Sequence, residues 1–549
     1  MTAPAHHQAE EFDYEGLFDA WKWDIPEHFN MAYDSCDKHV LGGKKEKIAL
    51  YWENENGDAR SYTFEDFRRL SNRFGNVLRG LGLRKGDRYI VRLPNIPEFQ
   101  ISFLGGLKIG AVPIPISTMF TAKEIAYRAN DSGSVLVVTT PEYVKDVEAI
   151  RERCQSLRHI IIAGRAGREH LSFEELMSRS SEDLEIERTR AEDLAFFCYT
   201  SGTTGDPKGA VHLHRWTIGN DPGMRHWVDY REGDILAHTG NLNWIYPLGN
   251  GFLYAWRWGA TILLYDGRFD PEQWFSLLEK YKVTVLQTVP TALRMMLTVG
   301  GVEQRYDLSH LRRVISAGEP LNPEVIMEWR RRFGHEIHDG IGMTEIMVYL
   351  SNMAGMPVKY GSCGRPQPGH RCAIVDSEGS VLPPHSSGTL AVHRSDPGLM
   401  RDYWNKPDKT AECLAGEWFL TGDMLFMDED GYYWFKGRGD DLIKASGYRI
   451  SPFEVESALI EHPAVLECAA VASPDRMRGN IVKAFVVLKG GYTPSEDLAM
   501  DIQNYVKHHY AAYKYPREIE FVPSLPKTQS GKIIRMQLRE LEIERKGGR

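Results

Sequence analysis

The fold is indicated most directly by residues 193–209, DLAFFCYTSGTTGDPKG, where an apolar run leads into a glycine-rich turn. The run has the pattern of a buried strand. Gly202 and Gly205 follow it, and glycine adopts positive φ at little steric cost. The chain is therefore expected to leave the edge of a sheet at this point and to turn through these two glycines.

Similar apolar runs recur along the chain, and helical patterns separate several of them. Helices are expected at 101–110, 271–281 and 322–334, the last with Asn322 and Pro323 as its start signal and Gly334 as its stop. Alternation of this kind predicts an α/β fold with parallel sheets and helices on their faces. Ligands of such sheets bind at the carboxyl ends of the strands. The turns after 193–200, 312–317 and 336–339 are the candidate positions. The runs are RYIVRLPN (88–95), SVLVVTT (134–140), HIIIAG (159–164), GATILLYDG (259–267), VTVLQTVP (283–290) and RRVISAGEP (312–320).

The pattern changes within residues 437–456, GRGDDLIKASGYRISPFEVE. A short helix is expected next, then strands at 467–472 and 481–488, a helix at 497–513 and a strand at 518–525. This is enough for a separate α+β domain. We therefore expect a large N-terminal domain, 1–439, and a small C-terminal domain, 440–549.

The composition is that of an ordinary globular protein and restricts its partners. The 549 residues carry a net charge of −9, which argues against nucleic-acid binding. Seven scattered cysteines without CxxC spacing suggest neither a disulfide framework nor a zinc site. The polar N-terminus lacks the pattern of a secretory signal, and Arg257 interrupts the most apolar window, 249–265. A cytoplasmic enzyme with small-molecule partners, and with no nucleic acid or membrane partner, is expected.

The glycine-rich turn has the chemistry of an anion site. Successive backbone N–H groups in such a turn can point at one phosphate, and hydroxyl side chains and Lys208 add donors and charge. It is not a Walker loop, because Asp206 and Pro207 separate Gly205 from Lys208.

The segment YTSGTTGDPKG (199–209) resembles the signature loop of the adenylate-forming acyl-CoA synthetase family. Further motifs of that family follow in its order: SAGEP (316–320), DGIGMTE (339–345), TGD (421–423), GRGDDLIKASGYRI (437–450) and PKTQSGKIIR (526–535). The similarity extends from about residue 45 to 540 and is greatest to medium-chain acyl-CoA synthetases and benzoate-type CoA ligases. It implies the adenylate-forming fold, with large parallel and mixed sheets flanked by helices and a mobile small domain. It also implies ATP, Mg²⁺ and coenzyme A as cofactors, and formation of acyl-CoA, AMP and pyrophosphate through an acyl-AMP intermediate.

The resemblance assigns an ATP site. Asp423 would accept hydrogen bonds from the ribose, and Arg438 would contact the ribose or a phosphate. Glu345 would hold Mg²⁺, with capping of a following helix as its alternative role. Many relatives have an aromatic residue where this chain has Ile341, so stacking on adenine is replaced by apolar packing. The complete nucleotide set is Thr200, Ser201, Gly202, Thr203, Thr204, Gly205, Lys208, Gly318, Glu319, Pro320, Asp339, Gly340, Ile341, Gly342, Met343, Thr344, Asp423, Arg438 and Lys532.

Lys532 resembles the lysine that bridges the α-phosphate and the carboxylate during adenylation, and it is expected to act with Thr344 and Glu345. Acetylation would remove its charge, which makes a protein acetyltransferase a candidate partner. Asp440 matches the hinge position of the family. The residues expected to meet coenzyme A are Ser446, Gly447, Tyr448, Arg478 and Tyr515.

The acyl site is expected at Trp244, Tyr246, Met347 and Arg449; Trp244, Tyr246 and Met347 could equally be ordinary core residues. We expect a medium-chain, branched or small aromatic carboxylate. The alternatives are an acetate-type ligase, an adenylating enzyme that serves a carrier protein, and a silent binding protein with the same fold. The oligomeric state is open, with a homodimer among the options.

Overall fold

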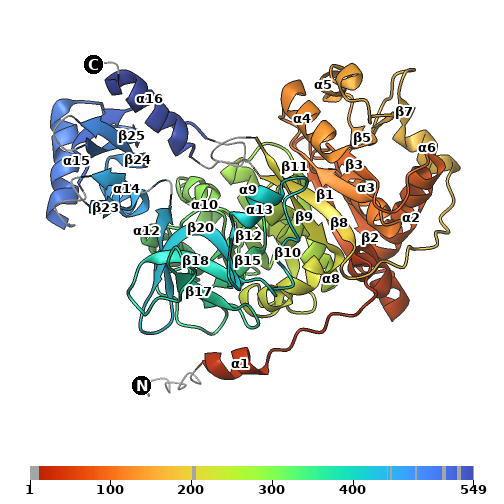
Figure 1. The fold of residues 1–549 in the computed structure, drawn as a ribbon, viewed down its shortest axis with the longest axis horizontal. Coiled ribbons are helices and arrows are strands. Elements are labelled where there is room, and N and C mark those ends of the chain that lie inside the picture. Colours follow the sequence, from red (N-terminus) through yellow and green to blue (C-terminus); the bar gives the residue numbers. More distant parts are fainter. Residues whose placement is uncertain are drawn as a thin grey trace.

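The computed structural model describes residues 12–200, 206–439, 441, 443–445, 448–475, 479–509, 515–527 and 533–547. Within these residues no helix has the length and apolar character needed to cross a membrane. The expected α/β fold is confirmed, with a large sheet-containing domain and a smaller C-terminal domain (Figure 1).

A nine-stranded sheet forms the centre of the large domain. Its six middle strands run parallel, and antiparallel strands lie at both edges. The predicted runs 259–267, 283–290 and 312–320 each contain one of the parallel strands. The order is β16 (Arg365–Pro366), β15 (Met347–Ser351), β14 (Ile337–Met343), β13 (Arg313–Ser316), β12 (Val285–Thr288), β10 (Ile235–His238), β11 (Thr261–Asp266), β1 (Ile48–Asn54) and β2 (Ala59–Thr63).

This sheet separates two apolar clusters. Side chains that alternate along the strands divide between them: Leu236 and Ile315 belong to one cluster, Ala237 and Val314 to the other. The second cluster is covered by α9 (Pro271–Lys280), α10 (Pro290–Leu297) and α12 (Pro323–Phe333). Gly334 ends α12 in the left-handed conformation, as predicted.

A five-stranded parallel sheet lies toward the N-terminal part of the domain. Its order is β4 (Val112–Pro115), β3 (Arg88–Val91), β5 (Leu136–Thr139), β6 (His159–Ile162) and β7 (Leu171–Ser172). It accounts for the predicted runs 88–95, 134–140 and 159–164. The helices of this region are α2 (Phe64–Gly80), α3 (Pro97–Lys108), α4 (Ala122–Ser132), α5 (Val144–Glu148) and α6 (Phe173–Arg179).

The strand at 193–200 differs from the expectation of parallel pairing. It is β8 (Leu194–Thr200), and it pairs antiparallel with β9 (Lys208–Leu213) as a separate two-stranded sheet. The glycine-rich turn therefore connects the two strands of a hairpin, because the chain returns beside itself instead of crossing to a parallel neighbour.

An antiparallel sheet completes the large domain. It contains β17 (Cys372–Val375), β18 (Gly388–His393), β20 (Trp418–Met427) and β19 (Leu414–Ala415), and β21 (Tyr433–Arg438) pairs with β20. The remaining helices are α1 (Tyr14–Ala20), α7 (Ile245–Leu248), α8 (Tyr254–Arg257), α11 (Val302–Arg305) and α13 (Pro407–Ala411).

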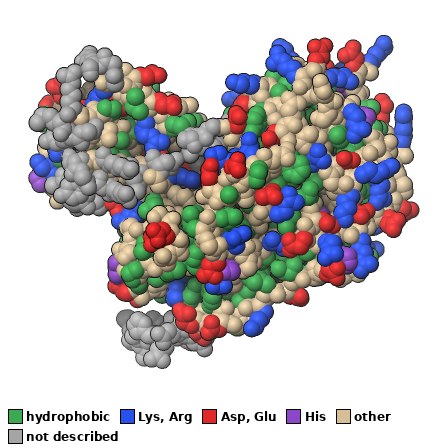
Figure 2. Space-filling model, in the orientation of Figure 1, with side chains coloured by type: hydrophobic (Ala, Val, Ile, Leu, Met, Phe, Trp, Pro, Cys, Tyr) green, Lys and Arg blue, Asp and Glu red, His purple; other side chains and the backbone are tan. Residues whose placement is uncertain are grey.

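The small domain projects as a separate lobe, with a notch between it and the upper part of the large domain (Figure 2). Its predicted elements are present, and a C-terminal helix, α16, is added. Asn322 Nδ2 donates to Ser457 Oγ across the two domains over 2.9 Å, and Lys436 pairs with Glu454. The elements are β22 (Ile443–Ala445), β23 (Tyr448–Ile450), α14 (Pro452–Ile460), β24 (Val465–Asp475), β25 (Gly479–Leu488), α15 (Glu496–His509), β26 (Glu518–Phe521) and α16 (Arg535–Gly547).

Candidate active site

The carboxyl ends of four neighbouring strands lie along one edge of the nine-stranded sheet. Ser316 of β13 is in register with Asp339 of β14 and with Thr288 of β12. Thr288 in turn shares a 2.6 Å hydroxyl hydrogen bond with Thr239, which follows β10. This register places the SAGEP turn beside the DGIGMTE segment, as parallel pairing requires.

The SAGEP turn holds an acidic side chain at this edge. Gly318 has φ of +96°, which favours glycine at that position. Glu319 Oε2 accepts hydrogen bonds from Thr291 Oγ1 at 2.8 Å and Arg294 Nη2 at 3.3 Å, both on α10. Its other oxygen, Oε1, is buried with no hydrogen-bond partner among the residues described. The motifs did not reveal Thr291 and Arg294, although Pro290 marks the start of their helix.

Asp339 is the buried acidic residue of the neighbouring strand. Burial raises the pKa of its carboxyl well above the usual range, and Oδ1 has no hydrogen-bond partner within the described part of the chain. Ile341 lies opposite Leu350 in the β14–β15 pair. A Cβ atom on Gly342 would lie 2.2 Å from the Met347 carbonyl oxygen, so the close return of the chain requires glycine there.

Glu345 lies in the turn between β14 and β15. A strand follows it, so the alternative role as a helix cap is wrong: Glu345 has no helix to cap. Tyr403 instead donates its hydroxyl to Glu345 Oε1, and the Lys208 ammonium lies 4.2 Å from the centre of the Tyr403 ring. Burial, and then the charge of Glu345, raise the pKa of Tyr403. One tyrosine that the sequence did not reveal thus connects the lysine of the phosphate loop with the candidate metal ligand.

Glu345 fits a magnesium ion held largely by phosphate and water oxygens. It is a single hard carboxylate, and the described residues contain no cluster of three or more acidic, histidine or cysteine ligands. Mg²⁺ commonly binds through one or two carboxylates together with substrate phosphates.

Asp423 and Arg438 face each other on neighbouring strands. They are in register in the β20–β21 pair, and Arg438 Nη1 lies 3.7 Å from Asp423 Oδ1. Asp423 is buried, whereas Arg438 is exposed. A buried acceptor beside an exposed guanidinium suits a sugar hydroxyl next to a phosphate.

The candidate acyl residues Tyr246 and Met347 are part of the same buried cluster. The Tyr246 ring stacks on Trp227 at 6.2 Å and meets the edge of the His238 ring at 4.5 Å. Burial, and then the charge of Asp339, raise the pKa of Tyr246 well above its usual range. Asp339 therefore lies close enough to affect Tyr246 electrostatically, so these acyl candidates adjoin the nucleotide candidates.

Trp244 lies at the edge of this group and contacts Phe120 at 6.4 Å between ring centres.

Tyr515 accepts a hydrogen bond from Arg517 Nη1 at 3.0 Å. Tyr448 and Arg449 belong to β23. The candidates Ser201, Gly202, Thr203, Thr204, Gly205, Asp440, Ser446, Gly447, Arg478 and Lys532 lie outside the described residues.

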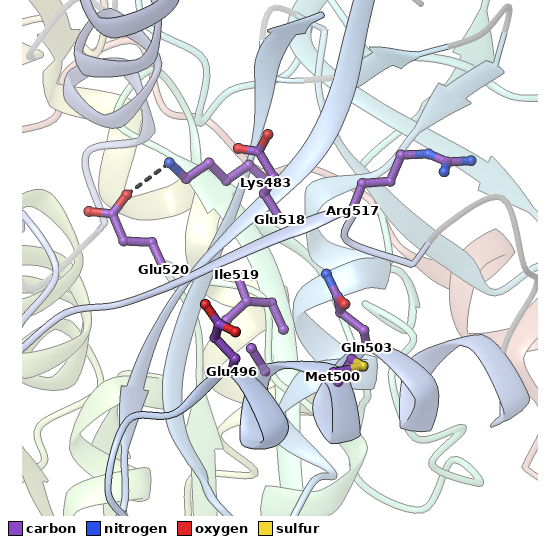
Figure 3. A pocket seen from close by; sticks show the side chains of 9 residues that line it. Lys483, Glu496, Met500, Gln503, Arg517, Glu518, Ile519 and Glu520 are labelled. Carbon is purple, nitrogen blue, oxygen red and sulfur yellow. Dashed lines mark ion pairs between the residues drawn. The ribbon is translucent and has the colours of Figure 1, made fainter.

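None of the candidates that the structure describes lines a groove in the small domain (Figure 3). It lies between α15 and β26, and its central cation, Lys483, is paired with Glu520 at 2.8 Å and with Glu542 at 2.6 Å. Charges that satisfy one another in this way indicate a structural role. The candidates of the SAGEP and DGIGMTE motifs lie instead at the carboxyl edge of the large sheet.

The family follows from comparison with known proteins. Residues 37–404 match the AMP-binding enzyme family, and residues 454–532 match the AMP-binding enzyme C-terminal domain. The chain belongs to the AMP-binding enzyme family. It is therefore an AMP-forming acyl-CoA synthetase, a ligase that uses ATP and coenzyme A, as its motifs predict.

Three relatives illustrate the similarity of this family member. Acetyl-coenzyme A synthetase of Bacillus subtilis (strain 168) is 40% identical, over 94% of this chain and 91% of its own. Acyl-coenzyme A synthetase ACSM3, mitochondrial, of Mus musculus is 38% identical over 96% of this chain and 93% of its own length. The crystal structure of the anthranilate CoA ligase AuaEII in complex with anthranoyl-AMP superposes with a TM-score of 0.88 at 34% identity, over 94% of this chain and 98% of that one.

Proposed function

We propose that this enzyme activates a medium-chain, branched or small aromatic carboxylate and transfers the acyl group from acyl-AMP to coenzyme A. The observation that carries the proposal is the pairing of Met347, a candidate acyl residue, with Met343, a candidate nucleotide residue, in the β14–β15 pair. Asp339 is also near enough to Tyr246 to affect the pKa of its hydroxyl. In the first step the substrate carboxylate must attack the α-phosphate, so the two sites have to adjoin.

The proposed roles follow from the charges in the site. Asp423 accepts from the ribose, and Arg438 contacts the ribose or a phosphate. Lys208 neutralises the phosphates that leave as pyrophosphate. Lys532 stabilises the charge that develops between the α-phosphate and the carboxylate. A fixed cation in a site that excludes water can contribute about 3 kcal/mol to such a step.

Glu345 is the proposed ligand of Mg²⁺, held in place by the Tyr403 hydroxyl. A bound Mg²⁺ would supply charge neutralisation for the phosphate oxygens. Tyr403 acts before any chemistry, because its hydroxyl holds the Glu345 carboxylate while the Lys208 ammonium lies over its ring.

The proposed domain boundary is supported by the course of the chain. β21 ends at Arg438 and β22 begins at Ile443, so the connection between the domains falls within 439–442. Asp440 is the proposed hinge. Rotation there would withdraw Lys532 after adenylation and admit coenzyme A at the segment that includes Tyr448.

Pyrophosphate release with ATP and a panel of acids tests this function. The panel contains acetate to decanoate, 2-methylbutyrate and benzoate, each with and without coenzyme A. One of the medium, branched or aromatic acids should give the highest rate and form a thioester. If no acid provokes pyrophosphate release, the proposal is wrong.

An acetate-type ligase is the second candidate, and the 40% identity to acetyl-coenzyme A synthetase supports it. Our preference for a larger acyl group rests on the apolar aromatic surface of the stacked Trp227 and Tyr246. A kcat/KM for acetate above those for hexanoate and benzoate would reverse this preference.

A further inference from the structure

We propose that His238 determines specificity in the acyl site, selecting a carboxylic acid whose acyl group carries a hydroxyl or carbonyl oxygen. The proposal rests on the proposed function, because it requires an acyl group to bind beside Tyr246. It adds a residue that no motif indicated.

His238 ends β10 at the same sheet edge as the other candidates. His238 is in register with Gln287 of β12. A Cβ atom added to Gly251 would lie 2.9 Å from the Cβ atom of His238. Side chains in register on parallel strands share a face. His238 therefore points to the face of the sheet that the segment containing Tyr246 and Gly251 covers.

The backbone fixes which ring nitrogen of His238 carries a proton. The Gly240 N–H donates to Nδ1 at 2.9 Å, which requires a lone pair on that nitrogen. Burial lowers the pKa of His238 to about 3, so the ring is neutral at physiological pH. The single proton of the neutral ring is then on Nε2. Nε2–H is a permanent donor.

This donor has no acceptor within the described residues, and the Tyr246 hydroxyl beside it has no partner there either. His238 is only 4% exposed and Tyr246 only 9%. Buried donors without partners are uncommon and costly in folded proteins. Unpartnered polar atoms also occur on the contacting core rings of His212, Trp216 and Tyr254. His238 differs because it lies at the carboxyl edge, where a ligand oxygen would complete the hydrogen bonds of both rings.

A neighbouring polar pair shows the contrast. On the same face, Gln287 Nε2 donates to the Asn250 carbonyl at 2.9 Å, and Asn250 Nδ2 donates to Gln287 Oε1 at 3.2 Å. These two bonds join the sheet to the covering segment, although Asn250 Oδ1 has no partner among the described residues. Within the described part of the chain, His238 has only the bond from Gly240, and that bond leaves Nε2 available.

The chemistry selects oxygen over an amine or a hydrocarbon. A hydroxyl or carbonyl oxygen accepts from Nε2–H, and it can also accept from the Tyr246 hydroxyl. An aromatic amine mainly donates, and a methyl group does neither. An apolar acyl group in the same place would leave both polar groups buried and unpaired.

Matched acids test the proposal in the full-length enzyme with ATP and coenzyme A. The pairs are 2-, 3- and 4-hydroxybenzoate against the corresponding methylbenzoates, and 3-, 4- and 5-oxohexanoate against the corresponding methylhexanoates. For at least one pair the oxygenated acid should have a kcat/KM about tenfold or more above its partner. His238→Phe should reduce that ratio to near one, and His238→Gln, which keeps an N–H donor, should restore much of it.

His335→Phe is the matched control. His335 Nε2 is also buried without a partner among the described residues, but it precedes β14 at the opposite edge of the sheet. This variant should leave the ratio unchanged. The inference is overturned if no oxygenated acid is preferred, if aminobenzoates surpass hydroxybenzoates, or if His238→Phe keeps the wild-type ratio. Absence of pyrophosphate release with every acid would instead overturn the proposed function.

Discussion

The polar residues at the two edges of the nine-stranded sheet differ in their hydrogen bonding. At the amino edge, Asp234, Thr284 and Arg312 immediately precede β10, β12 and β13 and bind one another. Asp234 Oδ1 accepts from Thr284 Oγ1 at 2.8 Å and from Arg312 Nε at 3.0 Å. At the carboxyl edge, Asp339 Oδ1 and His238 Nε2 have no partner in the described structure. These three residues of the amino edge satisfy one another, whereas the two groups of the carboxyl edge are available to a ligand.

Loss of Lys532 should give the largest effect, because it removes the charge that we propose the small domain contributes to adenylation. Lys532→Ala is expected to lower the rate of acyl-AMP formation about 100- to 1000-fold. Acetylation of Lys532 should have a similar effect. Pyrophosphate release measures this step, while thioester formation from supplied acyl-AMP should persist.

Lys527→Ala is the matched control for that substitution. Lys527 is in the same motif, but it pairs with Glu467 at 2.7 Å and is not assigned to the site. Adenylation should stay within about twofold of wild type. Undiminished adenylation by Lys532→Ala would show that the charge of Lys532 does not contribute to the adenylation step.

Restriction of the hinge should separate the two half-reactions. Proline fixes φ, so Asp440→Pro is expected to hinder rotation of the small domain. Acyl-AMP formation should be largely retained, and thioester formation should fall by about tenfold or more. Single-turnover assays of each step would decide this, and equal loss of both would refute the hinge at Asp440.

Two matched aspartates test the contrast between the edges directly. Asp234→Ala removes the buried acceptor of Thr284 and one of the two carboxylates that Arg312 binds, the other being Asp229 at 3.1 Å. It should lower the free energy of unfolding by about 2 kcal/mol, with kcat of the folded enzyme unchanged. Asp339→Asn should raise the KM for ATP about tenfold without loss of stability. Chemical denaturation and steady-state kinetics measure these two effects.

The sign of the Asp339 effect follows from its raised pKa. A carboxyl group that resists ionisation in the fold stabilises the protein fully below its ordinary pKa of about 4, and this stabilisation is lost as the pH rises. Asparagine does not ionise, so above that pH the free energy of unfolding of the variant should exceed that of the wild type. A loss of stability in Asp339→Asn would show that Asp339 stabilises the fold, as Asp234 does at the amino edge.

The smallest effect is expected at the contact between the domains. Glu324 begins α12, and burial together with hydrogen bonding to Glu461 of the small domain raises its pKa to about 7. Tyr505 also donates to Glu461, and His462 beside it pairs with Asp501. The contact is fully stabilising below the ordinary pKa of about 4.3 and weakens as the pH rises through about 7.

Glu324→Gln should therefore raise the melting temperature by a few degrees at pH 8 and have little effect at pH 5. Differential scanning calorimetry over this range measures it. An equal shift at both pH values would show that the Glu324 carboxyl does not titrate in this contact.

Local sequence patterns predicted much of the fold. Asn322, Pro323 and Gly334 marked α12 because start and stop signals act within a few residues. The glycine of SAGEP marked a turn at the carboxyl edge, because the positive φ of Gly318 favours glycine there. The antiparallel pairing of β8 with β9 was missed, since an apolar run does not specify its partner.

The site was predictable only where its residues lie within motifs. Glu345 and Lys208 were recognisable, but Tyr403, which joins them, is 58 positions from Glu345 and lies in no motif that the sequence revealed. His238 resembles any histidine at the end of a strand until the Gly240 N–H identifies its free nitrogen. Such contacts depend on the register of distant strands, which composition and periodicity do not specify.

The bond from Asn322 to Ser457 also affects how costly domain rotation is. Asn322 is the residue at the start of α12, yet its side chain makes no capping hydrogen bond there and donates to the small domain instead. If the small domain turns away at the hinge, the released amide can cap the helix, a contact usually worth about 1 kcal/mol. The new cap on α12 would then offset part of the free energy lost with the contact between the domains. The two orientations of the small domain would differ less in free energy than their contacts suggest.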